Sequence, residues 1–147
     1  MSLEIQIQQD IKAAMLAKEK TRLEALRGIK AAILLAKTAD GSDTITDEAI
    51  VKIVQKLVKQ RKESAEIYMQ QNRQELADSE LAEAAAMEVY LPKQLSETEV
   101  EAELKKIIAA VGASGPQDMG KVMGVATKQL AGKADGKLIS VLVKKLL

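Results

Sequence analysis

Apolar residues recur every three or four positions along most of this chain, which is the spacing of one face of an α-helix. In the first part of the chain the spacing predicts one helix over residues 3–18 and a second from Thr21 to about residue 37. Thr21 and Glu24 match a capping box, which marks a helix start. The predicted inner positions are Leu3, Ile7, Ile11, Ala14, Leu23, Leu26, Ile29 and Ile33.

A polar stretch over residues 38–45, with the turn signal Asp40-Gly41, precedes the next pair of helices. Thr46 is the predicted N-cap of the longest helix, over 46–71. Asn72 and Glu75 match a second capping box, at the start of an alanine-rich, acidic helix over 73–90. Pro92 stops that helix because proline lacks the backbone donor that a helix needs.

The short segment 91–95 marks the predicted boundary between two parts of the chain. After it, Ser96 and Glu99 match a further capping box. The remaining periodic segments predict three more helices, over 97–111, over 116–130 with Pro116 at its first position, and from Leu138 to the last residue.

Composition supports a helical fold. Aromatic residues make up 1% of the chain, with neither Phe nor Trp, and strong helix formers dominate. We therefore predict an all-α protein, with a four-helix N-terminal domain over 1–92 and a compact three-helix C-terminal domain over 96–147.

The residue types present restrict the chemistry that this chain can perform. It contains no Cys and no His, which excludes thiol catalysis, imidazole bases and Cys/His zinc sites. No pattern places two acids in an apolar pocket, so we predict no catalytic residue, no cofactor and no metal. No apolar run approaches the roughly 18 residues of a membrane span, and the N-terminus does not resemble a signal peptide. These features predict a cytoplasmic protein.

Arg61 lies on the apolar register of the helix over 46–71. A half-buried arginine is usually paired with a carboxylate, and Glu80 or Glu83 on the following helix could supply one. We interpret Arg61 as a structural residue.

The stretch 118–137 departs from the ordinary helical pattern, because glycines occupy positions where a simple helix would carry alanine. At about 100° per residue, one stripe of small residues runs beside the predicted core face, with lysines at its border. Three interpretations stay open: close packing against a neighbouring helix, close approach of a phosphate or RNA backbone, or glycines that the helix tolerates without a role. The core face comprises Met119, Met123, Ala126 and Leu130, the stripe comprises Gly120, Gly124, Thr127 and Ala131, and the border comprises Lys121 and Lys128.

The loop over 132–137 has a similar ambiguity. Glycine and lysine at a helix start can bind an anion, whereas the structural alternative is a helix C-cap followed by a turn. Leu138 follows Gly136-Lys137 where a P-loop needs a hydroxyl, so nucleotide binding is not expected. Residues 114–147 carry six lysines and two aspartates, which makes the end of the chain basic.

Several motifs together resemble the GatB/YqeY family. The resemblance extends over essentially the whole chain and includes a segment at the domain boundary, Tyr90-Leu91-Pro92-Lys93-Gln94-Leu95. The C-terminal signature is the most specific part: Asp118-Met119-Gly120-Lys121-Val122-Met123-Gly124, followed by Gly132-Lys133-Ala134-Asp135-Gly136. The N-terminal part contributes Asp10-Ile11-Lys12-Ala13-Ala14-Met15, Leu26-Arg27-Gly28-Ile29-Lys30-Ala31-Ala32 and Arg61-Lys62-Glu63-Ser64-Ala65.

The resemblance implies a four-helix part followed by a three-helix part. In this family the module forms the tail of the GatB subunit of tRNA-dependent amidotransferase and is appended to some glutaminyl-tRNA synthetases, where it helps to hold tRNA. It therefore implies an RNA-facing surface at eight positions of this chain: Gly120, Lys121, Gly124, Lys128, Gly132, Lys133, Gly136 and Lys137.

The resemblance also implies possible partners, namely tRNA together with amidotransferase subunits or an aminoacyl-tRNA synthetase. Neither DNA nor a membrane is an expected partner. Family members are associated with carbon–nitrogen ligase activity that uses glutamine as amido-N-donor, but this chain has no room for the catalytic domains. We expect a non-catalytic accessory module. The alternative is a protein–protein adaptor that makes no RNA contact and uses the Met119 and Met123 face.

Overall fold

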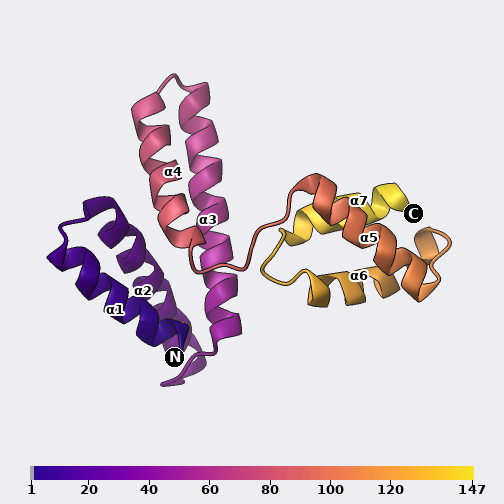
Figure 1. Ribbon diagram of the computed structural model, residues 1–147, viewed down its shortest axis with the longest axis horizontal. Coiled ribbons are helices and arrows are strands. Elements are labelled where there is room, and N and C mark those ends of the chain that lie inside the picture. Colours follow the sequence, from indigo (N-terminus) through magenta and orange to yellow (C-terminus); the bar gives the residue numbers. More distant parts are fainter. Residues whose placement is uncertain (1) are drawn as a thin grey trace. The chain divides into compact units, whose positions relative to one another are not determined.

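The structure, a computed structural model, describes residues 2–147. This part of the chain contains seven α-helices, one short 3₁₀ helix and no strand (Figure 1). The all-α class predicted from the sequence is therefore confirmed. The chain divides into two compact units, the first ending at Leu91 and the second beginning at Pro92, and we call them unit 1 and unit 2.

Unit 1 consists of α1 (Leu3–Leu16), α2 (Lys20–Asp40), α3 (Asp47–Gln70) and α4 (Gln74–Glu88). Helices α3 and α4 form a long antiparallel hairpin (Figure 1). Buried alanines, including Ala65, Ala77 and Ala84, let these two helices approach closely. Large side chains fill the core where all four helices meet: Ile7, Leu26, Ile29, Ile50, Val54 and Met87.

The predicted start of α3 is confirmed, because the Thr46 hydroxyl accepts a hydrogen bond from the Ala49 amide at 3.1 Å. The capping boxes at Thr21 and Asn72 are wrong. Helix α2 begins at Lys20, because Lys18 adopts a left-handed φ of 57° and makes a tight turn after α1. Asn72 has a φ of 59° and forms the turn before α4 instead of capping it.

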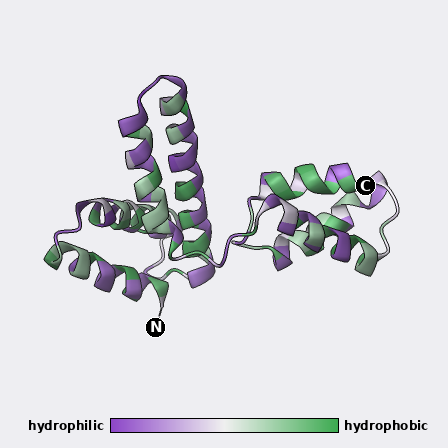
Figure 2. Cartoon of the chain, turned by 45° about the horizontal axis from the view of Figure 1, so that its top comes forward, coloured by the Kyte–Doolittle hydropathy of each residue, from purple (hydrophilic) through white to green (hydrophobic). Residues whose placement is uncertain are grey.

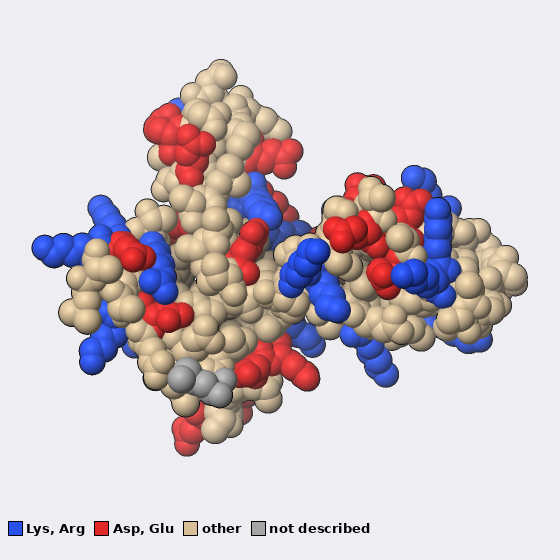
Figure 3. All heavy atoms as spheres, in the orientation of Figure 1, with Lys and Arg blue, Asp and Glu red and all other residues tan. Residues whose placement is uncertain are grey.

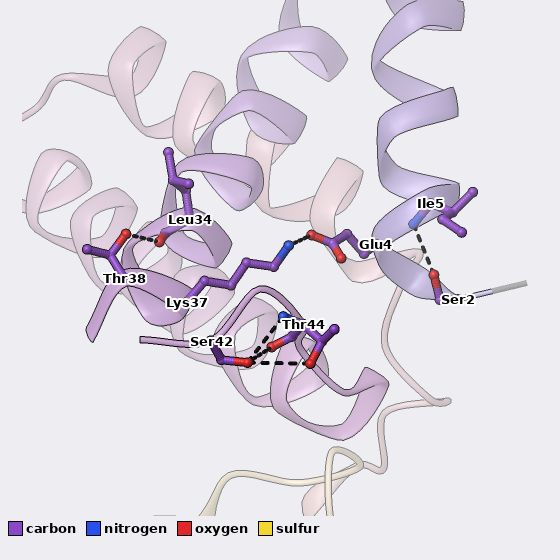
Figure 4. A network of polar contacts seen from close by, with 8 residues as sticks. All are labelled: Ser2, Glu4, Ile5, Leu34, Lys37, Thr38, Ser42 and Thr44. Atoms are coloured by element: carbon purple, nitrogen blue, oxygen red, sulfur yellow. Dashed lines mark hydrogen bonds and ion pairs between the residues drawn. The ribbon is translucent and has the colours of Figure 1, made fainter. Parts of the chain in front are cut away.

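The end of α2 is tied to the start of α1 (Figure 4). The Lys37 ammonium forms an ion pair with the Glu4 carboxylate across the two helices. Helix α2 runs to Asp40, further than predicted, and ends at Gly41 with a φ of 64°. The following turn is closed by the Ser42 hydroxyl, which donates to the Thr44 carbonyl at 3.0 Å.

Tyr90 links the end of α4 to the first two helices. Its side chain is buried, and its hydroxyl donates to the Asp10 carboxylate on α1 at 2.6 Å. The Arg22 guanidinium on α2 lies 3.8 Å from the same carboxylate. Burial, reinforced by the bond to Asp10, raises the pKa of the Tyr90 phenol well above its usual range. The tyrosine therefore remains a neutral donor that holds the last residues of unit 1 against its core.

Arg61 is a structural residue, as its position in the pattern predicts. Its Nε lies 3.9 Å from carboxylate oxygens of both Glu80 and Glu83 on α4. Burial raises the pKa of Glu83, while Arg61 acts in the opposite direction. A Cβ on Gly28 would lie 3.4 Å from the guanidinium, at the distance of an ordinary van der Waals contact, so Arg61 rests against α2 at this position.

Unit 2 consists of α5 (Glu97–Val111), the 3₁₀ helix η1 (Pro116–Asp118), α6 (Met119–Gln129) and α7 (Gly136–Leu146). The capping box at Ser96 and Glu99 is confirmed by two hydrogen bonds, of 3.2 and 3.1 Å. The Ser96 amide, which donates to the Glu99 carboxylate, lowers the pKa of this carboxyl group. Each helix turns an apolar stripe to the core (Figure 2), which contains Val100, Leu104, Ile107, Val122, Ala126, Leu130, Ile139, Leu142 and Val143.

Across residues 2–147 the structure contains no helix long and apolar enough to cross a membrane.

The Tyr90 link makes a prediction about stability. Replacing Tyr90→Phe removes the hydroxyl and leaves the half-buried Asp10 without this donor, so we expect unit 1 to lose about 1–2 kcal/mol. Urea unfolding followed by circular dichroism measures the loss. Tyr68→Phe is the matched control, because no hydrogen bond of the half-buried Tyr68 hydroxyl occurs in residues 2–147. Equal stability of the two variants would contradict the proposed role of the Tyr90 bond.

Candidate functional site

Helix α6 carries the glycine–lysine stretch and buries one narrow stripe, formed by Val122, Ala126 and Leu130. Two of these residues belong to the predicted core face, whereas Val122 was missed. Met119 and Met123, which the helical wheel placed on that face with Ala126 and Leu130, are only partly buried at its margin.

The small-residue stripe of α6 is open to solvent. Gly120 and Gly124 are both exposed, and a Cβ added to either would meet no atom within 4 Å outside its own helix segment, as far as residues 2–147 are concerned. Thr127 is also exposed, and its hydroxyl donates to the Met123 carbonyl at 2.8 Å. The close packing of this stripe against α5 or α7, one of the three interpretations of its pattern, therefore does not occur. We call Gly120, Gly124, Thr127 and Ala131 the open stripe.

Lys121 has a structural partner. Its ammonium donates to the Val111 carbonyl at 2.9 Å, at the C-terminal end of α5. A cation at this end of a helix satisfies an orphan carbonyl and interacts favourably with the helix dipole. Lys121, Lys128, Lys133 and Lys137 are all exposed, and Lys121 differs from the other three in this hydrogen bond within the fold.

The loop after α6 combines a required glycine with a contact that the sequence did not predict. Gly132 adopts a φ of 74°, which favours glycine. Its carbonyl accepts from the Gln94 side chain at 2.6 Å, and the Lys133 carbonyl accepts from the Leu95 amide at 2.9 Å. The segment that enters unit 2 is therefore bonded to the signature loop. Gly136 begins α7, with Asp135 at the N-cap position.

Charge is segregated within unit 2. Four of its acids lie on the first half of α5, where Glu101 pairs with Lys105 and Glu103 with Lys106. Residues 119–147 carry six lysines and a single acid, Asp135. Figure 3 shows lysine side chains projecting into solvent on several sides of this unit, with acidic side chains beside some of them. Within residues 2–147, five of the lysines on α6, α7 and the loop between them have no ion-pair partner: Lys128, Lys133, Lys137, Lys144 and Lys145.

The α7 lysines and α6 border a common groove. Met119 at the start of α6 lines it together with Pro116, and Lys144 and Lys145 line it from α7. On the helical wheel of α6, the open stripe lies between Met119 and Lys128. The stripe therefore has a lysine on one border and two lysines beyond the other. A bare helix surface near cations is suited to a polyanion. No group of three or more His, Cys, Asp or Glu side chains in residues 2–147 could hold a metal ion.

These features define the chain as an all-helical, two-unit protein with a glycine–lysine signature in its second unit. A model of the family described as "Yqey-like protein" matches residues 4–147, and the chain belongs to this family, the GatB/YqeY family.

The chain is also similar to fungal proteins named "Altered inheritance of mitochondria protein 41, mitochondrial". The Kluyveromyces lactis protein is 32% identical over 137 residues, which cover 90% of this chain and 69% of the relative. The Pyrenophora tritici-repentis protein is 28% identical over 95% of this chain and 78% of its own length. For the Meyerozyma guilliermondii protein the values are 36%, 81% and 64%. Their names place these relatives in mitochondria, so they lend no support to the cytoplasmic location expected from the sequence.

The open stripe predicts an unusual response to alanine. Gly124→Ala should stabilise unit 2 by up to about 1 kcal/mol, because alanine favours a helix interior and its Cβ meets nothing. Gly132→Ala should destabilise it by about 1 kcal/mol or more, because alanine is strained at a positive φ. Chemical unfolding of both variants tests this contrast. A loss of stability in Gly124→Ala would show that the stripe is packed after all.

Lys121 and Lys128 should also differ in their effect on stability. Lys121→Met removes the donor to the Val111 carbonyl, so we expect a loss of about 0.5–1.5 kcal/mol. The matched variant Lys128→Met removes an exposed lysine of the same helix and should change stability by less than about 0.5 kcal/mol. Chemical unfolding again provides the measurement, and equal losses would contradict the capping role of Lys121.

Proposed function

We propose that this chain is a non-catalytic accessory protein that binds tRNA through the open stripe of α6 and the exposed lysines around it. The observation that carries the proposal is the exposure of Gly120 and Gly124, which lie in a helix without packing against another one. Each glycine costs a helix interior about 1 kcal/mol relative to alanine. Since the fold does not require these glycines, a close approach by another molecule explains them best.

The lysines around the stripe indicate the chemistry of that molecule. Five ammonium groups without an ion-pair partner in residues 2–147 lie on α6, α7 and the loop between them. Phosphate groups dominate the affinity of proteins for nucleic acids, and lysine binds them as a point charge. The resemblance to the GatB tail, which helps to hold tRNA, favours tRNA over other polyanions.

In this proposal the chain contributes binding, and any carbon–nitrogen ligase chemistry with glutamine as amido-N-donor belongs to a partner. Amidotransferase subunits or an aminoacyl-tRNA synthetase are the proposed partners, by family resemblance. The location of the chain in the cytoplasm stays a prediction.

A protein–protein adaptor is the second candidate, favoured by the partial exposure of Met119 and Met123 beside the open stripe. A partner helix could pack on glycines and methionines without using the lysines. Binding that survives loss of the lysines and does not depend on salt would identify this role.

Filter binding of total tRNA tests the proposed function. At about 50 mM salt we expect Lys128→Gln with Lys133→Gln to bind about tenfold more weakly than wild type, with a salt slope reduced by between one and two units. The matched control is Lys105→Gln with Lys106→Gln, which removes two lysines of the same unit that are paired with acids.

The control variant should retain most of the affinity. Binding by wild type that is absent, or that is insensitive both to salt and to the Lys128 and Lys133 changes, would overturn the tRNA proposal.

A further inference from the structure

We propose that the RNA element held by unit 2 is a double-helical segment, contacted through its backbone, rather than a single-stranded loop contacted through its bases. This inference rests on the proposed function, and it specifies the class of RNA structure that the same surface receives.

The first argument comes from the cations and rings available in unit 2. All nine of its basic residues are lysines, and residues 92–147 contain no Arg, His, Phe, Tyr or Trp. Single-stranded RNA is bound by stacking its bases on aromatic rings or guanidinium planes, which contributes roughly 1–3 kcal/mol per base. Lysine provides a compact charge and no plane. The side chains of this unit therefore suit phosphates and not exposed bases.

The second argument comes from the arrangement of the lysines. Lys128 lies at one border of the open stripe, and Lys144 and Lys145 lie across the groove that Met119 lines beyond its other border. Lysines thus lie near both ends of a neutral strip of small residues, Lys144 and Lys145 near the start of α6 and Lys128 near its end. An A-form minor groove has the complementary pattern, a wide and shallow surface bordered by the phosphates of two strands.

The third argument comes from the shape and chemistry of the strip itself. Within α6 the stripe extends from Gly120 to Thr127, or about 10 Å at the rise of an α-helix, and Ala131 follows in the turn after the helix. Its surface is backbone with small side chains, so it can lie close to a shallow groove. The Thr127 hydroxyl donates to the Met123 carbonyl, which leaves its oxygen free to accept a hydrogen bond from a 2′-hydroxyl.

The rigidity of an RNA duplex also favours it over a single strand. A single strand must lose conformational freedom to follow a fixed set of lysines, and unit 2 offers no stacking to offset that loss. A duplex already holds its phosphates in a regular array. The same lysines should therefore bind a duplex more tightly than a flexible strand.

The test measures fluorescence anisotropy with the full chain at about 50 mM salt. The probes are an RNA duplex of about 20 base pairs and one of its strands, chosen to lack self-pairing. We expect the duplex to bind at least tenfold more tightly than the single strand. Gly124→Leu, which fills the open stripe, should weaken duplex binding at least fivefold.

Ala109→Leu is the matched control, because it places the same side chain at an exposed position of α5 and should leave duplex binding unchanged. Circular dichroism and thermal unfolding verify that both variants are folded. If the full chain binds the single strand as tightly as the duplex, or if Gly124→Leu binds the duplex like wild type, this inference is wrong and tRNA binding through the lysines still stands. If neither probe binds and tRNA does not bind either, the proposed function fails.

Discussion

The burial of one narrow stripe of α6 determines which face of this helix is exposed to solvent. Val122, Ala126 and Leu130 are packed among α5 and α7, and this contact fixes the rotation of α6 about its axis. The opposite side of the helix must then face solvent, and it carries Gly120 and Gly124. A helix that used these glycines for internal packing would have to turn by more than a third of a revolution and expose Val122. The packing of the core therefore determines that the open stripe faces solvent.

The turn after α6 depends on the same packing, and it is hydrogen-bonded to the first residues of unit 2. Leu130 anchors the end of α6 in the core, and Gly132 reverses the chain with a positive φ. The carbonyls of Gly132 and Lys133 then accept from the Gln94 side chain and the Leu95 amide. A molecule that holds the loop would thus also hold the segment through which unit 2 is connected to unit 1. The glycines of the signature have different roles, since Gly132 is required by the backbone and Gly124 is not.

Helical periodicity was sufficient to predict the class of fold and most helix limits, because every helix buries one apolar face. Side-chain caps were predicted less well. Thr46 and Ser96 cap their helices, whereas Thr21 and Asn72 match the same pattern without capping. The difference lies in turns that the pattern cannot detect, such as the left-handed conformation of Lys18.

The candidate site could be predicted only in part, for a similar reason. Small residues four apart indicate that something approaches a helix closely, but they do not say whether it is a neighbouring helix or another molecule. The hydrogen bond of Lys121 could not be predicted from the sequence either. Its contact with the Val111 carbonyl depends on how α5 and α6 meet, and ten residues of sequence separation do not reveal it. Arg61 was easier to interpret, because a cation on an apolar register needs an acid, and α4 places two beside it.

The division of charge between the two units favours unit 2 as the surface that meets a polyanion. Residues 2–91 carry thirteen basic and fifteen acidic side chains, whereas residues 92–147 carry nine and six. Within unit 2 the acids are concentrated at the start of α5, so the positive potential is strongest around α6 and α7. In the proposed function, this positive potential would steer a phosphate backbone toward the open stripe before any contact forms, whereas the acidic side chains of helix α4 would repel the same backbone. Charge would then direct the approach, and the bare surface of α6 would determine how close the backbone can come.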